Sequence, residues 1–580
     1  MRVLLSTLNA KYIHSSLAMA YLYAYCKDGA WDMEIKEYSI NENLENIMAE
    51  IFRKRPDVLA FSCYIWNIEY ILQLCADFKK ISPQTCIVLG GPEVSYDPVS
   101  LLKKHQEIDF IIRGEGEITL KELLRAFCGQ GSFKNVKGIT YRQGDYIYHN
   151  DDRELIDDLD IIPSPYNREN IRTYYKDKII YYETSRGCPF NCSYCLSSTM
   201  KGVRYFSLER VKKDLLLFME EKVKEVKLVD RTFNCNEERA REIMEFILEN
   251  NSCTRFHFEI GAELLSDEMI DFLKGIPPGI FDFEIGIQST CEKTLQAINR
   301  RSNWQVLKRK IKELIISQNI HIHLDLIAGL PFEDYITFKK SFNDVYNLEP
   351  DVIQLGFLKL LKGSPIRHDS CKYGYLFQNK PPYQVLKNYY ISYEELIKLK
   401  EIEELIEKYY NSGIAKNTLK YLVEKMYQND AFIFYEKMAD FWEERELFDR
   451  SHKREAEYMI LRDFILREHE EDYFAVELLK YDYFLNNHAH NLPSGFVSFN
   501  PDNAGEILYK LLKNRDFIKQ TIPEWEGKTA REIRRYVHLE YLQDNTIYKK
   551  NCFCKIIPVL FIYNPVRKKA EKVVDVSSFL

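Results

Sequence analysis

The sequence predicts an α/β protein of three parts: a doubly wound parallel sheet, a partial barrel of six β/α units and a mainly helical C-terminal region. Strand-like and helix-like segments alternate through the first two thirds of the 580 residues. Glycine-rich turns follow several apolar strands, as they do where parallel sheets bind ligands. Helical spacing then replaces the alternation. From these changes we expect a sheet over residues 1–140 and a connector over residues 141–175. A barrel should follow over residues 176–368 and a helical domain over residues 369–580.

Composition sets the broad class. The chain is 46% apolar and 29% charged, which is ordinary for a globular protein. A net charge of −7 gives no general attraction to nucleic acids or anionic membranes. No run approaches the ~20 apolar residues of a membrane-spanning helix, and residues 1–5 are too short for a signal-peptide core. We therefore expect a cytoplasmic protein outside the membrane. Basic residues outnumber acidic ones near the C-terminus, so an RNA substrate stays open.

The first sheet is predicted from short apolar segments that end in turns. The candidate strands are residues 3–8, 58–62, 86–89 and 110–112, with a helix over residues 17–25. Two of the strands run into glycine-rich segments, which contain Gly90 and Gly91 in one case and Gly114 and Gly116 in the other. These turns would lie at the carboxyl edge of a parallel sheet. A hairpin around Gly144 is expected within the connector.

The barrel is predicted from six further strands, whose carboxyl ends would carry the active site. They are residues 179–182, 225–229, 255–260, 281–287, 320–327 and 352–358. Beyond them, helical spacing covers residues 394–410, 415–427 and 452–469. A polar loop with His488, His490 and Asn491 is expected to be solvated rather than to touch a substrate.

Three of the fourteen cysteines form a motif directly after the first barrel strand. Cys188, Cys192 and Cys195 have the spacing C-x3-C-x2-C, whereas most of the others stand alone in apolar stretches, as buried thiols do. Three thiolates on one loop can bind three irons of a 4Fe–4S cluster and leave the fourth iron open. Structural zinc would need a fourth ligand, and the next cysteine, Cys235, is not at finger spacing. The spacing therefore predicts a 4Fe–4S cluster.

With Tyr194 before its last cysteine, the motif resembles the signature of the radical S-adenosylmethionine (SAM) superfamily. The resemblance implies that SAM chelates the open iron and that the cluster cleaves it to methionine and a 5′-deoxyadenosyl radical. Later strand ends also resemble the family and imply cofactor contacts from Tyr194, Asp230, Arg231, Glu259, Glu284, Gln288, Ser289, Asp325 and Gly329. For Asp230 and Arg231 a buried ion pair is the alternative. Cys235 is expected to be an inert thiol rather than a hydrogen donor.

A doubly wound sheet before such a barrel resembles the cobalamin-binding class of this superfamily. The resemblance rests on residues 89–93 and 110–117, where small residues would let the backbone approach a corrin ring. It implies cobalamin contacts from Asn9, Ser62, Tyr64, Trp66, Gly90, Gly91, Pro92, Glu93, Gly114, Glu115, Gly116 and Glu117. His14 lacks the Asp-x-His-x-x-Gly context of a cobalt ligand, which implies cobalamin without a protein imidazole. The alternative is a sheet that only docks the barrel.

Two related layouts are disfavoured by their cysteine requirements. Methylthiotransferases carry a second cluster on their N-terminal domain, but Cys26 and Cys75 fall in helical patterns here. Auxiliary C-terminal clusters would have only Cys371, Cys552 and Cys554, and the last two have the spacing of a strand.

We therefore expect a cobalamin-dependent radical SAM enzyme, and a methyltransferase acting on an unactivated carbon through methylcobalamin. Rearrangement, cyclisation or RNA modification without methyl transfer stays open. A cobalamin- or SAM-binding sensor is the alternative of another class, which the intact cysteine loop disfavours. The resemblance implies a one-electron donor such as flavodoxin or ferredoxin and a small-molecule or RNA substrate. The C-terminal region resembles an uncharacterised helical domain found in one subgroup.

Overall fold

A computed structural model describes residues 1–580 apart from residues 201, 470–471, 489–491, 544–545, 547–554 and 566–568. His490, Asn491, Cys552 and Cys554 therefore lie outside the described residues. The chain divides into two compact units, Met1–Leu396 and Ile397–Leu580. The first residues of the expected C-terminal domain, 369–396, thus belong to the first unit.

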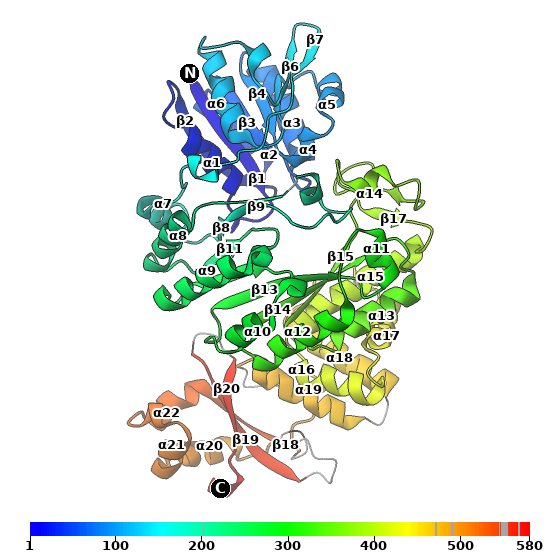
Figure 1. Cartoon of the computed structure of the whole chain (residues 1–580). Helices are drawn as coiled ribbons and strands as arrows, with labels where there is room; N and C mark the ends of the chain where they lie inside the picture. Colours follow the sequence, from blue (N-terminus) through cyan, green and yellow to red (C-terminus); the bar gives the residue numbers. More distant parts are fainter. Residues whose placement is uncertain (201, 470–471, 489–491, 544–545, 547–554, 566–568) are drawn as a thin grey trace. The chain divides into compact units, whose positions relative to one another are not determined.

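The N-terminal sheet has seven strands in the order β2-β1-β3-β4-β5-β6-β7 (Figure 1). Its first five strands are all parallel, with the 2-1-3-4-5 order of flavodoxin-like sheets. They are β1 (Arg2–Asn9), β2 (Asp32–Ser39), β3 (Val58–Ser62), β4 (Cys86–Gly90) and β5 (Phe110–Ile112). One apolar cluster packs α1 (Leu17–Cys26) and α6 (Gly116–Phe127) on one face. A second cluster packs α2 (Leu44–Lys54) and α3 (Ile68–Ile81) on the other.

Two parts of this sheet differ from expectation. Strand β2 is missing from the prediction because charged residues such as Glu34 and Lys36 interrupt its apolar pattern, as is common on edge strands. The hairpin around Gly144 forms as expected, from β6 (Ile139–Gln143) and β7 (Tyr146–His149). It extends the sheet through antiparallel pairing with β5 and is therefore not part of a connector.

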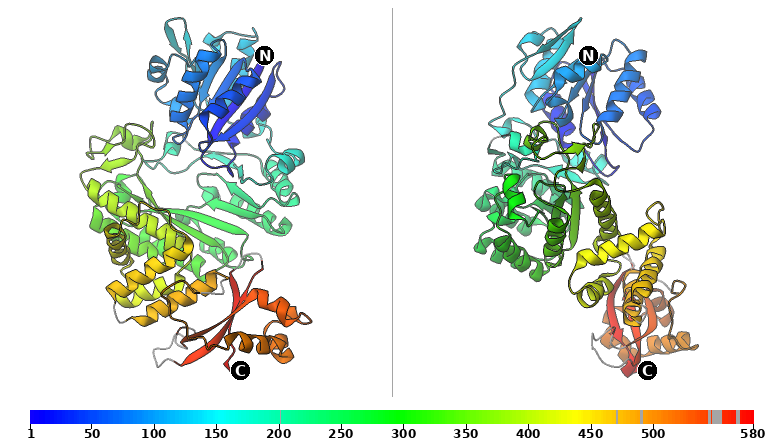
Figure 2. Two further views of the ribbon diagram at one scale, coloured as in Figure 1. Left: turned by 180° about the vertical axis from the view of Figure 1, so that it is seen from behind. Right: turned by 90° about the vertical axis from the view of Figure 1, so that its right-hand side faces the viewer.

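The barrel sheet is a row of six parallel strands in the order β15-β14-β13-β12-β11-β8. The strands are β8 (Ile180–Tyr182), β11 (Glu225–Leu228), β12 (Arg255–Glu259), β13 (Phe281–Gln288), β14 (His321–Ala328) and β15 (Val352–Phe357), close to all six predicted segments. Figure 2 shows this sheet in green with helices along one side. Those helices include α8 (Leu208–Glu220), α9 (Glu237–Asn250), α10 (Asp267–Lys274), α12 (Trp304–Ser317) and α13 (Tyr335–Tyr346).

The two faces of the barrel sheet differ in polarity. Outward residues such as Phe256, Phe258 and Leu324 are buried under the helices. On β14 the inward residues alternate with buried outward ones and are partly or fully exposed. The first two of these inward residues are His321 and His323. Barrel interiors are usually filled by branched apolar side chains. The inner face of this sheet is instead lined with ionisable groups.

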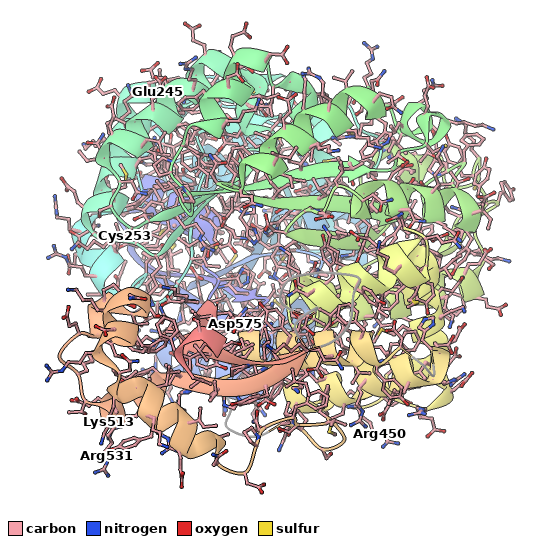
Figure 3. All side chains as sticks on the ribbon, turned by 90° about the horizontal axis from the view of Figure 1, so that it is seen from below. Glu245, Cys253, Arg450, Lys513, Arg531 and Asp575 are labelled. Atoms are coloured by element: carbon pink, nitrogen blue, oxygen red, sulfur yellow. The ribbon has the colours of Figure 1, made fainter. Side chains whose placement is uncertain are left out.

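The second unit combines helices with a small sheet. The predicted helices correspond to α15 (Tyr393–Leu405), α16 (Lys416–Tyr421) and α18 (Arg454–Glu468). Further helices of this unit include α17 (Ala431–Glu444), α19 (Tyr473–Asn486) and α20 (Ala504–Lys513). The prediction misses an antiparallel sheet of β18 (Val537–Gln543), β19 (Ile556–Tyr563) and β20 (Ala570–Asp575). Figure 3 shows Lys513 and Arg531 extending outward from this unit. No described helix is long and apolar enough to cross a membrane.

Candidate functional site

The three motif cysteines line one cavity at the carboxyl ends of the barrel strands. After β8 the chain forms β9 (Ser185–Gly187) and then reaches Cys188. The cavity has a volume of about 190 Å³, and its lining includes Cys188, Cys192, Cys195 and Tyr194. Gly187 has φ +100°, and an added Cβ would lie 2.1 Å from the carbonyl oxygen of Gly202. Only glycine therefore permits the close pairing of β9 with β10 (Val203–Tyr205) that sets the direction of the loop.

Side chains from successive strands complete the cavity. Besides Tyr194, five residues predicted from the family resemblance line it together with the cysteines: Arg231, Glu259, Glu284, Gln288 and Asp325. The carboxyl ends of neighbouring parallel strands meet at one edge, which explains how residues far apart in the sequence converge here. Three predicted residues, Asp230, Ser289 and Gly329, do not line the cavity.

Those three residues have structural partners instead. The Asp230 carboxylate is buried and accepts hydrogen bonds from the Thr184 backbone N–H and hydroxyl and from the Ser185 hydroxyl. It therefore stabilises the chain just before the cysteine loop, and it does not form the ion pair that we considered with Arg231. The Ser289 hydroxyl donates to Glu333 at 2.5 Å. Gly329 has φ +90°, and its carbonyl accepts hydrogen bonds from Tyr375 and Asn388.

Sequence reasoning misses Arg300. This buried guanidinium lies 3.9 Å from the Cys192 sulfur through Nη1, and its Nη2 donates to the Gly286 carbonyl at 2.6 Å. A carboxylate oxygen of Glu263 lies 3.5 Å away. Arg300 reaches the cavity from the loop after α11 (Glu292–Ala297), where no motif marks it. A fixed cation beside the sulfur favours the thiolate form that binds metal. Burial works in the opposite direction and raises the pKa of Cys192.

The carboxylates of the cavity differ in their ionisation. Burial raises the pKa of Glu259, and it raises that of Asp325 strongly, with the neighbouring Glu284 charge adding to the effect. The pKa of Glu284 is lowered, chiefly by a hydrogen bond with His257 at 3.0 Å. The cavity thus combines one carboxyl group whose pKa is lowered with two whose pKa values are raised, beside Arg231 and Arg300.

The residues present fit an iron–sulfur cluster better than a single metal ion. Among the described residues, no three His, Cys, Asp or Glu side chains converge on one ion. In a cubane each thiolate binds its own iron, so the sulfurs surround a volume rather than a point. Buried polar atoms without a protein partner also lie around the cavity: Gln288 Oε1, Arg300 Nε and Asp325 Oδ1. Such orphaned atoms are typical of a site that binds a polar ligand.

On the N-terminal sheet, several predicted residues gather at the carboxyl edge. Tyr64 and Trp66 stack with ring centroids 4.4 Å apart, and the Trp66 indole donates to the Leu8 carbonyl. Gly91 has φ +103°, and a Cβ there would lie 2.6 Å from the Cys63 carbonyl oxygen. Asn9 is tied to Glu37 at 2.6 Å. Ser62, Gly90, Pro92, Gly114 and Gly116 lie at the ends of β3, β4 and β5 or in the turns that follow them.

The three predicted glutamates of this edge contact the barrel. Glu93 is buried, lies 3.6 Å from the Lys362 ammonium group, and accepts a hydrogen bond from the Tyr383 hydroxyl at 2.7 Å. Arg186 of β9 pairs with Glu117 at 2.6 Å, Glu183 at 2.8 Å and Glu115 at 3.3 Å, and Arg204 pairs with Glu115 at 2.8 Å. We call these five residues, Arg186, Arg204, Glu115, Glu117 and Glu183, the Arg186 network. It joins the sheet to the hairpin that carries the cysteine loop, so these side chains have a docking role that the sequence did not indicate.

The remaining described cysteines do not assemble beside this edge. Cys26 and Cys75 belong to the apolar clusters on opposite faces of the N-terminal sheet, and Cys371 is exposed. The thiol of Cys235 lies 3.1 Å from the Tyr205 hydroxyl, and burial raises its pKa.

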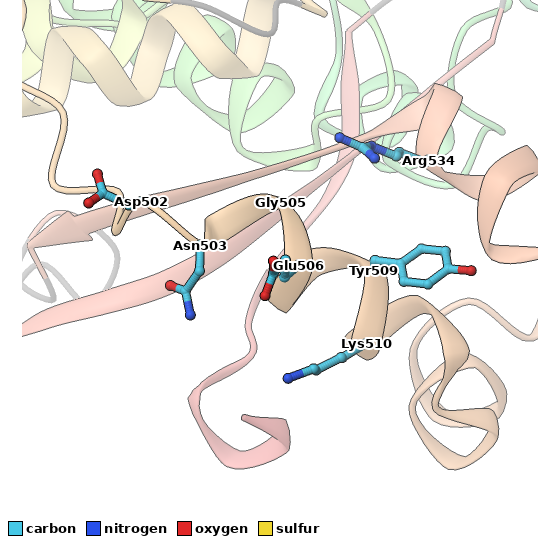
Figure 4. Close-up of a pocket in the computed structure, with 7 residues that line it drawn as sticks. All are labelled: Asp502, Asn503, Gly505, Glu506, Tyr509, Lys510 and Arg534. Carbon is cyan, nitrogen blue, oxygen red and sulfur yellow. The ribbon is translucent and has the colours of Figure 1, made fainter.

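A second cavity, of about 630 Å³, lies in the C-terminal unit. It is lined by Asp502, Asn503, Gly505, Glu506, Tyr509, Lys510 and Arg534. Figure 4 shows that these side chains point in different directions and do not converge on one point. The cysteine cavity is therefore the better candidate site.

Comparisons with known proteins divide the chain in the same order. Residues 3–124 match the B12 binding domain family, residues 182–345 the radical SAM superfamily, and residues 371–561 a family of proteins of unknown function, DUF4080. The chain is 29% identical over 317 residues to the cobalamin-dependent radical SAM methyltransferase TokK of Streptomyces tokunonensis. That match covers 50% of the chain and 45% of TokK, so the chain spans about half the length of this relative. An uncharacterized methyltransferase, PH0819 of Pyrococcus horikoshii, is 25% identical over 72% of the chain and 91% of its own length.

Solved structures share the fold. The cobalamin-dependent SAM radical enzyme OxsB with aqua-cobalamin bound matches 83% of the chain and 79% of its own chain at a TM-score of 0.59 and 16% identity. A radical SAM domain implies a 4Fe–4S cluster and SAM, and a B12 binding domain implies cobalamin. Along the chain, the B12 binding domain, the radical SAM superfamily and DUF4080 thus match three successive segments.

Proposed function

We propose that this protein is a cobalamin-dependent radical SAM methyltransferase that acts on an unactivated carbon. The observation that carries the proposal is the cavity in which three cysteines meet strand-end carboxylates, joined through the Arg186 network to a B12-type sheet. Both ligand-binding edges, the carboxyl ends of two parallel sheets, thereby belong to one compact unit. When bound, the cluster supplies the electron that cleaves SAM, and methylcobalamin supplies the methyl group.

The residues of the chain have distinct roles in this proposal. Cys188, Cys192 and Cys195 hold three irons, and the Arg300 guanidinium beside Cys192 favours its thiolate. Tyr194 packs against the adenine of SAM. Glu259, Glu284, Gln288 and Asp325 supply hydrogen-bonding groups for the amino, carboxylate and hydroxyl groups of that ligand, and Arg231 supplies a positive charge for its carboxylate.

At the N-terminal edge, the corrin ring would lie against the stacked Tyr64 and Trp66. The glycines around Gly91 would let the backbone approach it. Asn9, Ser62, Pro92, Gly114 and Gly116 would contact its side groups, with no protein imidazole on cobalt. A one-electron donor of the flavodoxin or ferredoxin class would reduce both metal centres. A reduced cluster with free thiols suits a reducing compartment, so we place the protein in the cytoplasm.

The test is anaerobic purification, reconstitution with iron, sulfide and hydroxocobalamin, desalting, and an absorption spectrum. We expect a broad iron–sulfur band near ~400 nm and retained corrin in near-equal amount to protein. Changing Cys188, Cys192 and Cys195 together to Ala should abolish the iron–sulfur band, whereas the matched control Cys235→Ala should keep it. A band that persists in the triple variant would show that the cluster is ligated elsewhere. A cluster without retained corrin would leave a radical SAM enzyme but refute methyl transfer from cobalamin. SAM cleavage to 5′-deoxyadenosine separates an enzyme from a sensor.

A further inference from the structure

Three histidines extend from the cavity along the inner face of the barrel sheet. His257 lies on β12, and His321 and His323 lie on β14, with Glu284 between them on β13. The strand register places Glu284 directly beside His323. Since alternate residues of a strand share a face, His321, His323 and Asp325 all face the same side. We call His257, His323 and His321 the histidine ladder.

The members of the ladder are in contact with one another or with Glu284. His257 Nε2 lies 3.0 Å from Glu284 Oε2, and His323 Nε2 lies 2.9 Å from His321 Nδ1. The ring centroids of His257 and His323 are 5.9 Å apart, and those of His321 and His323 are 4.8 Å apart. Exposure increases along the ladder, since His257 is buried, His323 is half-buried and His321 is exposed. The three rings therefore lie in a row that leads from a cavity carboxylate toward solvent.

The charges around Glu284 explain why it needs this support. From β12 it faces His257 and Glu259, and from β14 it faces His323 and Asp325; Lys227 of β11 adds a positive charge. Two neighbouring carboxyl groups would favour protonation of Glu284, yet its pKa is lowered, with the His257 hydrogen bond as the largest cause. Burial lowers the pKa of His323 to about 4, so this ring is neutral near pH 7 and both donates and accepts a proton.

We propose that His257 is a positioning residue, whose Nε2–H donates to the Glu284 carboxylate and aims it into the cavity as an acceptor for a hydrogen-bond donor of SAM. This inference rests on the proposed function, because it takes SAM as the ligand of the cavity. Hydroxyl groups bind an ionised carboxylate more strongly than a neutral one.

The experiment measures the affinity of the reconstituted full chain for SAM itself, without reductant, by anaerobic equilibrium dialysis across a pH series. His257→Phe keeps a ring but removes the donor, whereas His257→Gln can place an amide N–H near the position of Nε2. The matched control is His105→Asn, since His105 at the end of α5 (Pro98–Lys104) makes a hydrogen bond of the same 3.0 Å length with Glu107 in the N-terminal domain. Iron content and thermal melting establish that each variant is folded and loaded.

We expect His257→Phe to weaken SAM binding about tenfold at neutral pH, the size of a lost hydrogen bond to a charged group. Its loss of affinity on acidification should begin at a higher pH than in the wild type, because Glu284 is protonated more easily. His257→Gln should recover most of the affinity. If His257→Phe binds SAM as the wild type does, or if His257→Gln is equally impaired, the positioning role is refuted while the proposed function stands. A wild-type protein that holds a cluster but binds no SAM would refute both.

Discussion

The Arg186 network provides a direct test of how the N-terminal sheet is held on the barrel. The Arg186 side chain is 13% exposed and pairs with Glu115, Glu117 and Glu183, whose side chains are 6–16% exposed. Arg186→Met would keep the length of the side chain but remove the charge. Glu115 would retain Arg204 at 2.8 Å, whereas Glu117 and Glu183 would lose the cation that they contact.

The size of the effect follows from burial. Removing one partner of a buried ion pair costs about 3–5 kcal/mol, because the other charge is left without compensation. Glu183 moderates this cost, since burial raises its pKa to about 7 even with Arg186 present and the group can take up a proton near neutral pH. We therefore expect about 3 kcal/mol of destabilisation from Arg186→Met, most of it from the unpaired charge of Glu117.

The assay is native-state hydrogen exchange of the amides in β9 and β10, which reports the opening free energy of the hairpin locally. A double-mutant cycle with Glu117→Gln isolates the pair. Adding Glu117→Gln to Arg186→Met should recover part of the lost stability, because it removes the unpaired charge. The control Arg172→Met removes the exposed Arg172 from Glu221, which keeps Arg168 as a partner at 2.9 Å, and it should leave the hairpin unchanged. If the two substitutions destabilise the hairpin additively, the network does not hold the sheet in the way argued.

Two further substitutions test backbone geometry and a buried acid. Gly91→Ala should destabilise the N-terminal sheet more than Gly114→Ala in urea unfolding, and it should reduce cobalamin retention. Both glycines have positive φ, but only at Gly91 would an added Cβ meet backbone, at 2.6 Å. Equal effects of the two substitutions would contradict this account. Burial raises the pKa of Glu333 from 4.5 to about 7. The unfolded chain therefore loses this proton at a lower pH than the folded protein does. The stability of the folded protein should accordingly fall as the pH rises between these two values. Glu333→Gln should remove about 3 kcal/mol of that fall, and parallel melting curves for wild type and variant across this range would refute the assignment.

The sequence predicts the barrel well because its physical signals are local. Each strand is a short apolar run whose outward residues, such as Phe258 and Leu324, are buried under helices. The cysteine spacing likewise carries its chemistry within eight residues. Strand β2 escapes prediction because an exposed edge tolerates charged residues. Strands β18 to β20 lie in the region that we expected to be mainly helical.

The cavity could be predicted only in part. Residues at strand ends, such as Glu259 and Glu284, can be placed from topology because parallel strands bring their carboxyl ends together. Arg300 cannot, since it comes from a loop whose path depends on tertiary packing. Asp230 has the expected position in sequence but turns to Thr184 and Ser185, a choice between two sets of partners that only the folded chain settles.

The glutamates of the N-terminal edge have the same ambiguity of partner as Asp230. A strand-end motif indicates that a carboxylate lies at the ligand edge, but its partner can be a ligand or the neighbouring domain. Glu93, Glu115 and Glu117 contact Lys362, Arg204 and Arg186 of the barrel, so the loops that would surround a corrin ring are the same loops that dock the barrel. A ligand that orders these loops would then stabilise the docking contacts by linkage. Cobalamin should accordingly slow hydrogen exchange in β9 and β10, although both strands belong to the barrel, and Arg186→Met should weaken that protection.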